Sequence, residues 1–97
     1  MKIIKDQNGT QLTIALEGRL DTTTAPELEK ELGGLNGVTA LTLDFSRLEY
    51  ISSAGLRVLL SAHKRMSRQG GMKVTNVNEI VNEVFEVTGF SDILTIE

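Results

Sequence analysis

The chain has 97 residues, no cysteine and a formal net charge of −3 at pH 7. Without cysteine it has no disulfide framework, thiol nucleophile or cysteine-based metal site, and its mildly acidic balance lacks the basic surface that strong binding to nucleic acid requires. The length suits one domain over residues 1–97, and no apolar run approaches membrane-spanning length, so we expect a cytoplasmic protein that makes no contact with the membrane.

Residues 2–5 and 11–17 are predicted to pair as a β-hairpin around Asn8-Gly9. The Asn-Gly pair favours a type I′ turn, in which both central residues have positive φ. Between residues 11 and 17, leucine and isoleucine alternate with smaller or polar side chains. This period of two predicts a strand with one buried face.

An amphipathic helix is predicted to begin after Thr24. Thr24 and Glu27 fit a capping box, and Pro26 falls in the first turn, where its missing N–H costs little. Apolar residues then recur at helical spacing until Gly33-Gly34 ends the run. These apolar positions are Ala25, Leu28, Leu32 and Leu35.

Residues 38–45 are predicted to form the central strand of a sheet. Leu41, Leu43 and Phe45 share one face, and the shorter side chains on the other face suit a sheet that is more exposed there. A short polar step at residues 44–47 then leads into a loop.

A long helix is predicted over residues 55–69, where apolar positions form a wide stripe. Gly70-Gly71 is expected to supply a left-handed cap. Basic residues near the end of this helix complement the negative end of the helix dipole, an interpretation that we favour over a binding patch. They are His63, Lys64, Arg65 and Arg68.

Residues 73–77 are predicted as the next strand and residues 93–96 as a last short one. Between them, Asn78 caps a third helix that closes at Thr88-Gly89. The order ββαβαβαβ predicts an α/β fold with a mixed sheet of four to five strands and three helices. Helical crossovers make the later strands parallel.

Two hydroxyl groups, those of Ser52 and Ser53, lie where the loop becomes the long helix. The first turn of a helix has unpaired N–H groups and the positive end of the dipole, so it holds anions such as phosphate. A serine here is either an ordinary N-cap or a hydroxyl whose phosphate the helix would stabilise. The position alone leaves both interpretations open.

Asp21 is the carboxylate that follows the second strand. If the second and central strands are neighbours, Asp21 lies near Ser53, where it could orient the hydroxyl or help to hold a metal–nucleotide brought by a partner kinase. It could equally cap Thr23 or Thr24. Asp44 and Ser46 carry a weaker version of this argument and are interpreted as turn residues.

The residues for catalysis are missing from the sequence. His63 is the only histidine, it lies far along the helix from Ser53, and we interpret it as a partly buried helix residue. Residues 33–37 lack the ending of a phosphate-binding P-loop, and kinase signatures are absent. We expect no catalytic residue, no metal site and no cofactor; the chain can receive a phosphoryl group but not transfer one.

The segment Tyr50 to Leu60, with the sequence YISSAGLRVLL, resembles the phosphorylation segment of the anti-sigma factor antagonists, small bacterial proteins built on a STAS domain. The resemblance extends to Gly18-Arg19-Leu20-Asp21 and to Gly70-Gly71, and it covers essentially the whole chain in order. It implies a single STAS domain over residues 1–97 that binds other proteins and is not an enzyme.

In that family the unphosphorylated antagonist binds an anti-sigma factor that is also a serine kinase, and this releases the sigma factor. Phosphorylation of a serine ends the binding, and a PP2C-type phosphatase reverses it. The resemblance assigns the acceptor to Ser53, with Ser52 as the runner-up, since Ser52 stands where many members have Asp. The expected partner-binding residues are Asp21, Thr22, Thr23, Ser52, Ala54, Gly55, Leu56 and Arg57.

We expect the protein to act as a monomer. STAS domains also occur in anion transporters and lipid-transport complexes. The alternative function is therefore that of a scaffold or subunit that binds a transporter or lipid-transport partner without being phosphorylated.

Overall fold

Five strands form one mixed sheet, in the order β1-β2-β3-β4-β5, in the computed structural model, which describes residues 1–97. β1 pairs with β2 antiparallel, and the pairs β2–β3, β3–β4 and β4–β5 are parallel. The strands are β1 Lys2–Asn8, β2 Gln11–Leu20, β3 Ala40–Ile51, β4 Met72–Thr75 and β5 Thr95–Ile96.

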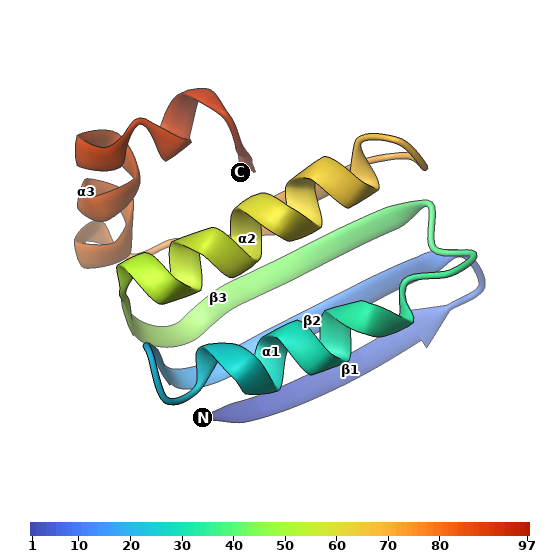
Figure 1. Cartoon of the computed structure of the whole chain (residues 1–97), viewed down its shortest axis with the longest axis horizontal. Coiled ribbons are helices and arrows are strands. Elements are labelled where there is room, and N and C mark those ends of the chain that lie inside the picture. The colour runs from blue at the N-terminus through green and yellow to red at the C-terminus, as the bar shows by residue number, and fades with distance from the viewer.

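The predicted order ββαβαβαβ is confirmed. The helices are α1 Ala25–Glu31, α2 Ser53–Met66 and α3 Glu79–Thr88, with short 3₁₀ helices at Leu32–Gly34 and Phe90–Asp92. Figure 1 shows α1 and α2 side by side over one face of the sheet, and α3 beside the end of the sheet at which α2 begins. None of these helices combines the length and apolarity needed to cross a bilayer.

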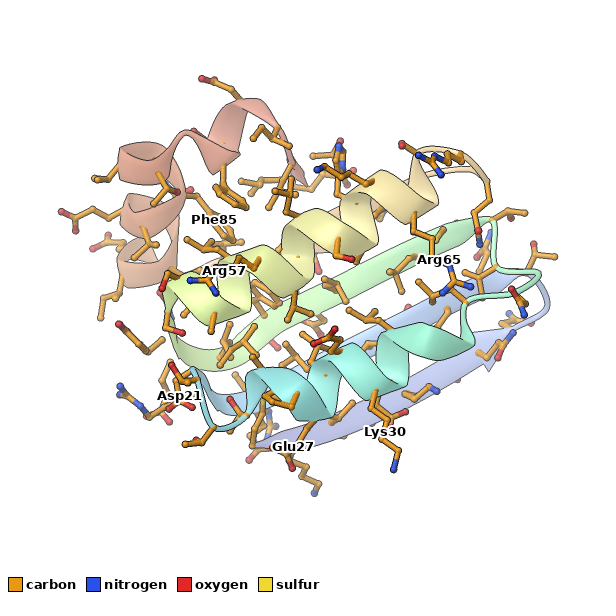
Figure 2. The ribbon with its side chains drawn as sticks, in the orientation of Figure 1. Asp21, Glu27, Lys30, Arg57, Arg65 and Phe85 are labelled. Carbon is orange, nitrogen blue, oxygen red and sulfur yellow. The ribbon has the colours of Figure 1, made fainter.

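The core lies between the sheet and the helices. Along β3, Leu41, Leu43 and Phe45 are buried while the residues between them are partly exposed, as the period of two predicts. Phe85 of α3 points toward the body of the molecule (Figure 2), and its ring centroid lies 6.4 Å from that of Phe45. Burial of each such side chain contributes about 1.5–3 kcal/mol, so α3 is anchored by the same core as α2.

β3 begins at Ala40 and ends six residues later than predicted, because it continues to Ile51 instead of ending at Phe45. Its pairing with β2 contains two register shifts, at each of which β3 has one extra residue. These bulges break the period of two, so Leu48 and Ile51 are each buried three residues after the previous buried position. The predicted loop after Phe45 is therefore wrong.

Two predicted local motifs, the type I′ turn of the hairpin and the capping box of the first helix, are also wrong. The hairpin loop consists of Gly9 and Thr10, and only Gly9 has positive φ (66°), which excludes a type I′ turn. Thr24 precedes α1 but makes no side-chain cap hydrogen bond. Its hydroxyl is bonded instead to the backbone of Asp21 and Arg19, so the capping box with Glu27 does not form.

The end of α2 differs from its prediction as well. The helix stops at Met66, and Ser67 at its C-cap has a right-handed conformation (φ −63°) instead of a left-handed one. Gly70 has a φ of 151°, and a Cβ added there would lie 1.8 Å from the Thr39 carbonyl oxygen. The backbone of Thr39 lies so close to Gly70 that no side chain fits there, so position 70 requires glycine.

The basic residues at this end include one with a specific structural role. His63, Lys64 and Arg65 lie in the last turn of α2, as the dipole interpretation expects. The Arg65 guanidinium donates hydrogen bonds to the Leu32 carbonyl oxygen at 3.4 Å and the Asn36 side-chain oxygen at 3.1 Å. Arg65 therefore ties α2 to the segment that follows α1.

Candidate functional site

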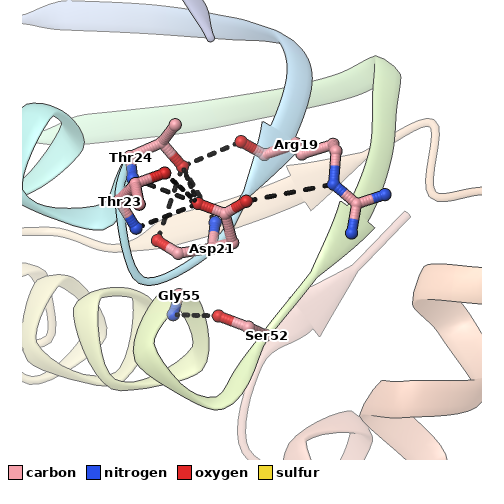
Figure 3. Close-up of polar contacts among 6 residues, drawn as sticks. All are labelled: Arg19, Asp21, Thr23, Thr24, Ser52 and Gly55. Atoms are coloured by element: carbon pink, nitrogen blue, oxygen red, sulfur yellow. Dashed lines mark hydrogen bonds and ion pairs between the residues drawn. The ribbon is translucent and has the colours of Figure 1, made fainter.

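The ends of β2 and β3 bring the predicted site residues together. Leu20 and Ile51 are the last paired residues, and the Ser52 N–H donates to the Leu20 carbonyl oxygen at 2.9 Å. Asp21 and Ser52 therefore leave the same edge of the sheet (Figure 3). The sequence placed Asp21 near Ser53 on the condition that the second and central strands are neighbours, and β2 and β3 do pair directly.

The two serines have different environments. Ser52 is the half-buried N-cap of α2: it is extended (φ −100°, ψ 176°), and its Oγ accepts a hydrogen bond from the Gly55 N–H at 3.5 Å. Ser53 is the first residue of the helix, its side chain is exposed, and its hydroxyl has no hydrogen-bond partner within the chain. The capping role belongs to Ser52, which leaves the Ser53 hydroxyl free for other chemistry.

The Asp21 carboxylate organises the turn between β2 and α1. Its Oδ1 accepts hydrogen bonds from the Thr23 hydroxyl at 2.7 Å, the Thr23 N–H at 3.0 Å and the Thr24 N–H at 3.2 Å (Figure 3). These bonds, led by the one from the Thr23 hydroxyl, lower the pKa of Asp21 below its ordinary value. Of the two interpretations of Asp21, capping of Thr23 and Thr24 is the one that the hydrogen bonds support.

The Thr24 hydroxyl closes the same turn. It accepts a hydrogen bond from the Asp21 N–H at 2.8 Å and donates one to the Arg19 carbonyl oxygen at 2.8 Å. Both partners are backbone groups near the end of β2, so the bonds hold the turn in one conformation. The turn is thus fastened to the end of β2, where the Leu20 carbonyl oxygen accepts the hydrogen bond from the Ser52 N–H.

Sequence reasoning missed the role of Arg19. Its Nε lies 3.9 Å from the Asp21 Oδ2, and its guanidinium carbon lies 4.5 Å from the centroid of the Tyr50 ring. Arg19 and Tyr50 are direct neighbours across β2 and β3, which is a favourable cation–π arrangement. The sequence did not indicate this pair of residues, because the central strand was predicted to end at Phe45, before Tyr50.

The other predicted partner-binding residues divide by burial. Thr22, Thr23 and Arg57 are exposed and Ala54 is half-buried, whereas Gly55 and Leu56 are buried. Gly55 and Leu56 thus pack α2 against the sheet. A cleft of about 340 Å³ runs between α1 and α2 beside these residues, and Arg57 lies on the outer side of the first turns of α2 (Figure 2). The residues that line this cleft include Thr22, Pro26, Glu29, Ala54, Arg57 and Ser61.

Asp44 and Ser46 are not turn residues, because both belong to β3. The Asp44 Oδ1 accepts hydrogen bonds from the Asn76 side chain and from the Ser46 N–H, each at 3.0 Å. The bond from Asn76 is the main cause that lowers the pKa of Asp44. These bonds stabilise the bulged part of β3.

In the whole chain, no group of three His, Cys, Asp or Glu side chains is placed to share a metal ion.

Comparison with known proteins adds a family and a set of relatives. The family model described as "Mlab, STAS domain" matches residues 3–95. BtrV of Bordetella bronchiseptica is 37% identical over 99 residues, a match that covers 99% of this chain and 85% of BtrV. The anti-sigma-B factor antagonist of Bacillus subtilis is 32% identical over 92 residues, covering 93% of this chain and 84% of that protein.

Solved structures with low sequence identity share the fold. An anti-sigma factor antagonist from Mycobacterium paratuberculosis superposes with a TM-score of 0.89 at 22% identity, covering 98% of this chain and 83% of that one. The antagonist SpoIIAA superposes in its unphosphorylated form with a TM-score of 0.85 at 19% identity, covering 99% and 88%. Its phosphorylated form gives a TM-score of 0.77 at 18% identity, covering 99% and 91%.

Proposed function

The chain belongs to the STAS domain family, and we propose that residues 1–97 form one domain that acts as an anti-sigma factor antagonist switched by phosphorylation of Ser53. In this role it is a binding protein and not an enzyme. The name of the Bacillus subtilis relative, at 32% identity over nearly the whole chain, supports this class of function. The fold shared with SpoIIAA, which is known in an unphosphorylated and a phosphorylated form, is consistent with a modification that preserves the fold.

The observation that carries the proposal is the division of roles between the two serines. Ser52 already caps α2, while the Ser53 hydroxyl is exposed at the first residue of the same helix. A kinase can reach an exposed hydroxyl without unfolding the helix. A phosphate at this position gains about 0.3–1 kcal/mol from the positive end of the helix dipole, so the domain tolerates the modification.

The switch follows from the change in charge. Phosphorylation adds about −1.5 to −2 charges to Ser53. In the unphosphorylated form, the surface that comprises Ser53, Thr22, Thr23 and Arg57 binds the anti-sigma factor, and the sigma factor is released. After phosphorylation, the same interface has to desolvate a dianion or oppose it to like charge, which costs several kcal/mol. A loss of about 3 kcal/mol weakens binding more than a hundredfold.

The partner completes the chemistry. An anti-sigma factor that is also a serine kinase supplies ATP and the catalytic residues, and this chain supplies the acceptor hydroxyl. A PP2C-type phosphatase removes the phosphate and restores binding. Asp21 contributes indirectly, because its hydrogen bonds to Thr23 and Thr24 hold the turn beside the acceptor.

The test is incubation of the protein with ATP and its candidate anti-sigma kinase, followed by mass spectrometry of the peptide that contains Ser52 and Ser53. We expect one phosphate, on Ser53. Phosphate on Ser52 would move the acceptor to the capping residue. Phosphate on neither serine would favour the alternative, a STAS scaffold or subunit that binds a transporter or lipid-transport partner without modification.

A further inference from the structure

The outer face of α3 carries an apolar stripe whose two ends, Ile80 and Val87, are exposed. Ile80, Val84 and Val87 recur at positions i, i+4 and i+7, so they lie along one side of the helix. Ile80 is 61% exposed and Val87 is 81% exposed. The helix is anchored by a different side, on which Val81 and Phe85 are fully buried. Val84 lies between Ile80 and Val87, is half-buried and packs against the core, so Ile80 and Val87 are the residues of the stripe that remain free for another contact.

An acidic stripe runs beside the apolar one. Glu79, Glu83 and Glu86 have the same spacing, each one residue before a member of the apolar stripe, and all three are exposed. None of them takes part in an ion pair within this chain. There is no lysine or arginine between residues 74 and 97, so nothing in this segment offsets their charge.

The surface around Ser53, at the same end of the sheet as α3, differs from the outer face of α3 because it contains arginine side chains. Arg57 is exposed on the first turns of α2, and Arg19, which lies 3.9 Å from the Asp21 carboxylate, is exposed at the end of β2. Surfaces of opposite charge select partners of opposite charge, because like charges across an interface cost several kcal/mol. The face of α3 is thus suited to a different contact from the one around Ser53.

We propose that the outer face of α3 is a second docking surface, and that it binds a partner protein whose apolar side chains are flanked by lysine or arginine. A second copy of this chain in a symmetric dimer would bring the two acidic stripes together, which opposes self-association through α3. Anionic lipid and nucleic acid are repelled for the same reason. The inference does not depend on the proposed function of Ser53.

The probes are two designed helical peptides that share one leucine face and differ in its flanks, which are lysine in one peptide and glutamate in the other. Each is titrated into isotope-labelled protein while backbone amide shifts are followed by NMR. We expect the lysine-flanked peptide to shift the amides of Ile80, Val84 and Val87 and to leave those of Ser53 and Gly55 unchanged. The glutamate-flanked peptide should bind at least about tenfold more weakly.

Three variants make the test specific. Val87→Ser should weaken the lysine-flanked peptide about tenfold, whereas Ile4→Ser should not change its affinity, because Ile4 is an exposed aliphatic residue of β1, outside α3. Glu83→Lys combined with Glu86→Lys should reverse the preference between the peptides. Thermal melts of the three variants check folding, which exposed substitutions should preserve.

Three results would overturn the proposal. The first is that neither peptide shifts α3. The second is binding that ignores the charge of the peptide and the Val87→Ser change, which would indicate non-specific hydrophobic contact. The third is a dimer in sedimentation velocity that Val87→Glu converts to a monomer, because the occupant of the surface would then be a second copy.

Discussion

Leu20, at the end of β2, packs so closely under Gly55 of α2 that a Cβ added to Gly55 would lie 2.7 Å from the Leu20 Cγ. The same Cβ would lie 2.9 Å from the Ile51 Cγ1. Leu20 and Ile51 are buried and cannot move aside without disturbing their neighbours. The absent side chain at Gly55 therefore sets how near the first turn of α2, with Ser52 and Ser53, approaches the edge of the sheet.

Gly55→Ala is expected to destabilise the fold. Overpacking costs about 1–3 kcal/mol, and the gain of about 1 kcal/mol in helix propensity offsets only part of it. Urea unfolding should show a net loss of about 1 kcal/mol. Gly33→Ala is the matched control, because a Cβ at Gly33 meets nothing within 4 Å and its φ is not positive; its stability should be unchanged or slightly raised. Equal effects of the two changes would disprove the close packing.

Substitutions of Ser52 and of Ser53 should differ in their effect on the free energy of unfolding. Ser52→Ala removes the cap of α2 and should lower the free energy of unfolding by about 0.5–1 kcal/mol, at the low end of cap losses because the bond to Gly55 is 3.5 Å long. Ser52→Asp should retain the cap. Ser53→Ala and Ser53→Asp should stay within about 0.5 kcal/mol of the wild type. A loss of more than about 2 kcal/mol in either Ser53 variant would mean that Ser53 is chiefly structural.

Binding to the anti-sigma kinase should depend on the charge at Ser53. Ser53→Ala should bind the kinase with wild-type affinity and should not be released by ATP, because it has no acceptor hydroxyl. Ser53→Asp should bind poorly, and the phosphorylated wild type should bind more than about a hundredfold more weakly than the unmodified protein. Isothermal titration calorimetry measures all three affinities. Equal affinities for the Ala and Asp variants would refute the electrostatic switch.

The acid stability of the fold should depend on Asp21 and Asp44. Hydrogen bonds hold the pKa of each below its ordinary value, led by the bond from Thr23 for Asp21 and from Asn76 for Asp44. A lowered pKa in the folded state stabilises the protein above the pKa of the unfolded chain, and this contribution is lost as the pH falls through the folded value. The loss should therefore begin near pH 4 and continue below it.

Asp21→Asn and Asp44→Asn should each flatten the decline in the free energy of unfolding below about pH 4. Urea unfolding at a series of acidic pH values measures this slope. Asp92→Asn is the control, because the exposed Asp92 carboxylate accepts no hydrogen bond within the chain, and it should follow the wild-type profile. A wild-type slope in both test variants would show that the two carboxylates do not contribute to acid stability.

Local patterns determined the elements and their order. The period of two in β2 and the first half of β3 and the helical spacing in α2 predicted strands and helices with the buried faces that the structure shows. Asn78 also caps α3 as predicted, by accepting a hydrogen bond from the Val81 N–H at 2.8 Å, and Gly89 ends that helix with a φ of 82°. These features depend on residues close in sequence, so the sequence alone contains them.

Tertiary structure decided the details of the site. The bulges that carry β3 on to Ile51 exist only because β2 continues to pair with it, and they place Tyr50 beside Arg19. The bonds of the Thr24 hydroxyl to the end of β2 displaced the predicted capping box. Which serine caps and which is exposed depends on how α2 leaves the sheet edge over Leu20. Contacts between strands far apart in sequence set that geometry, and no local pattern encodes them.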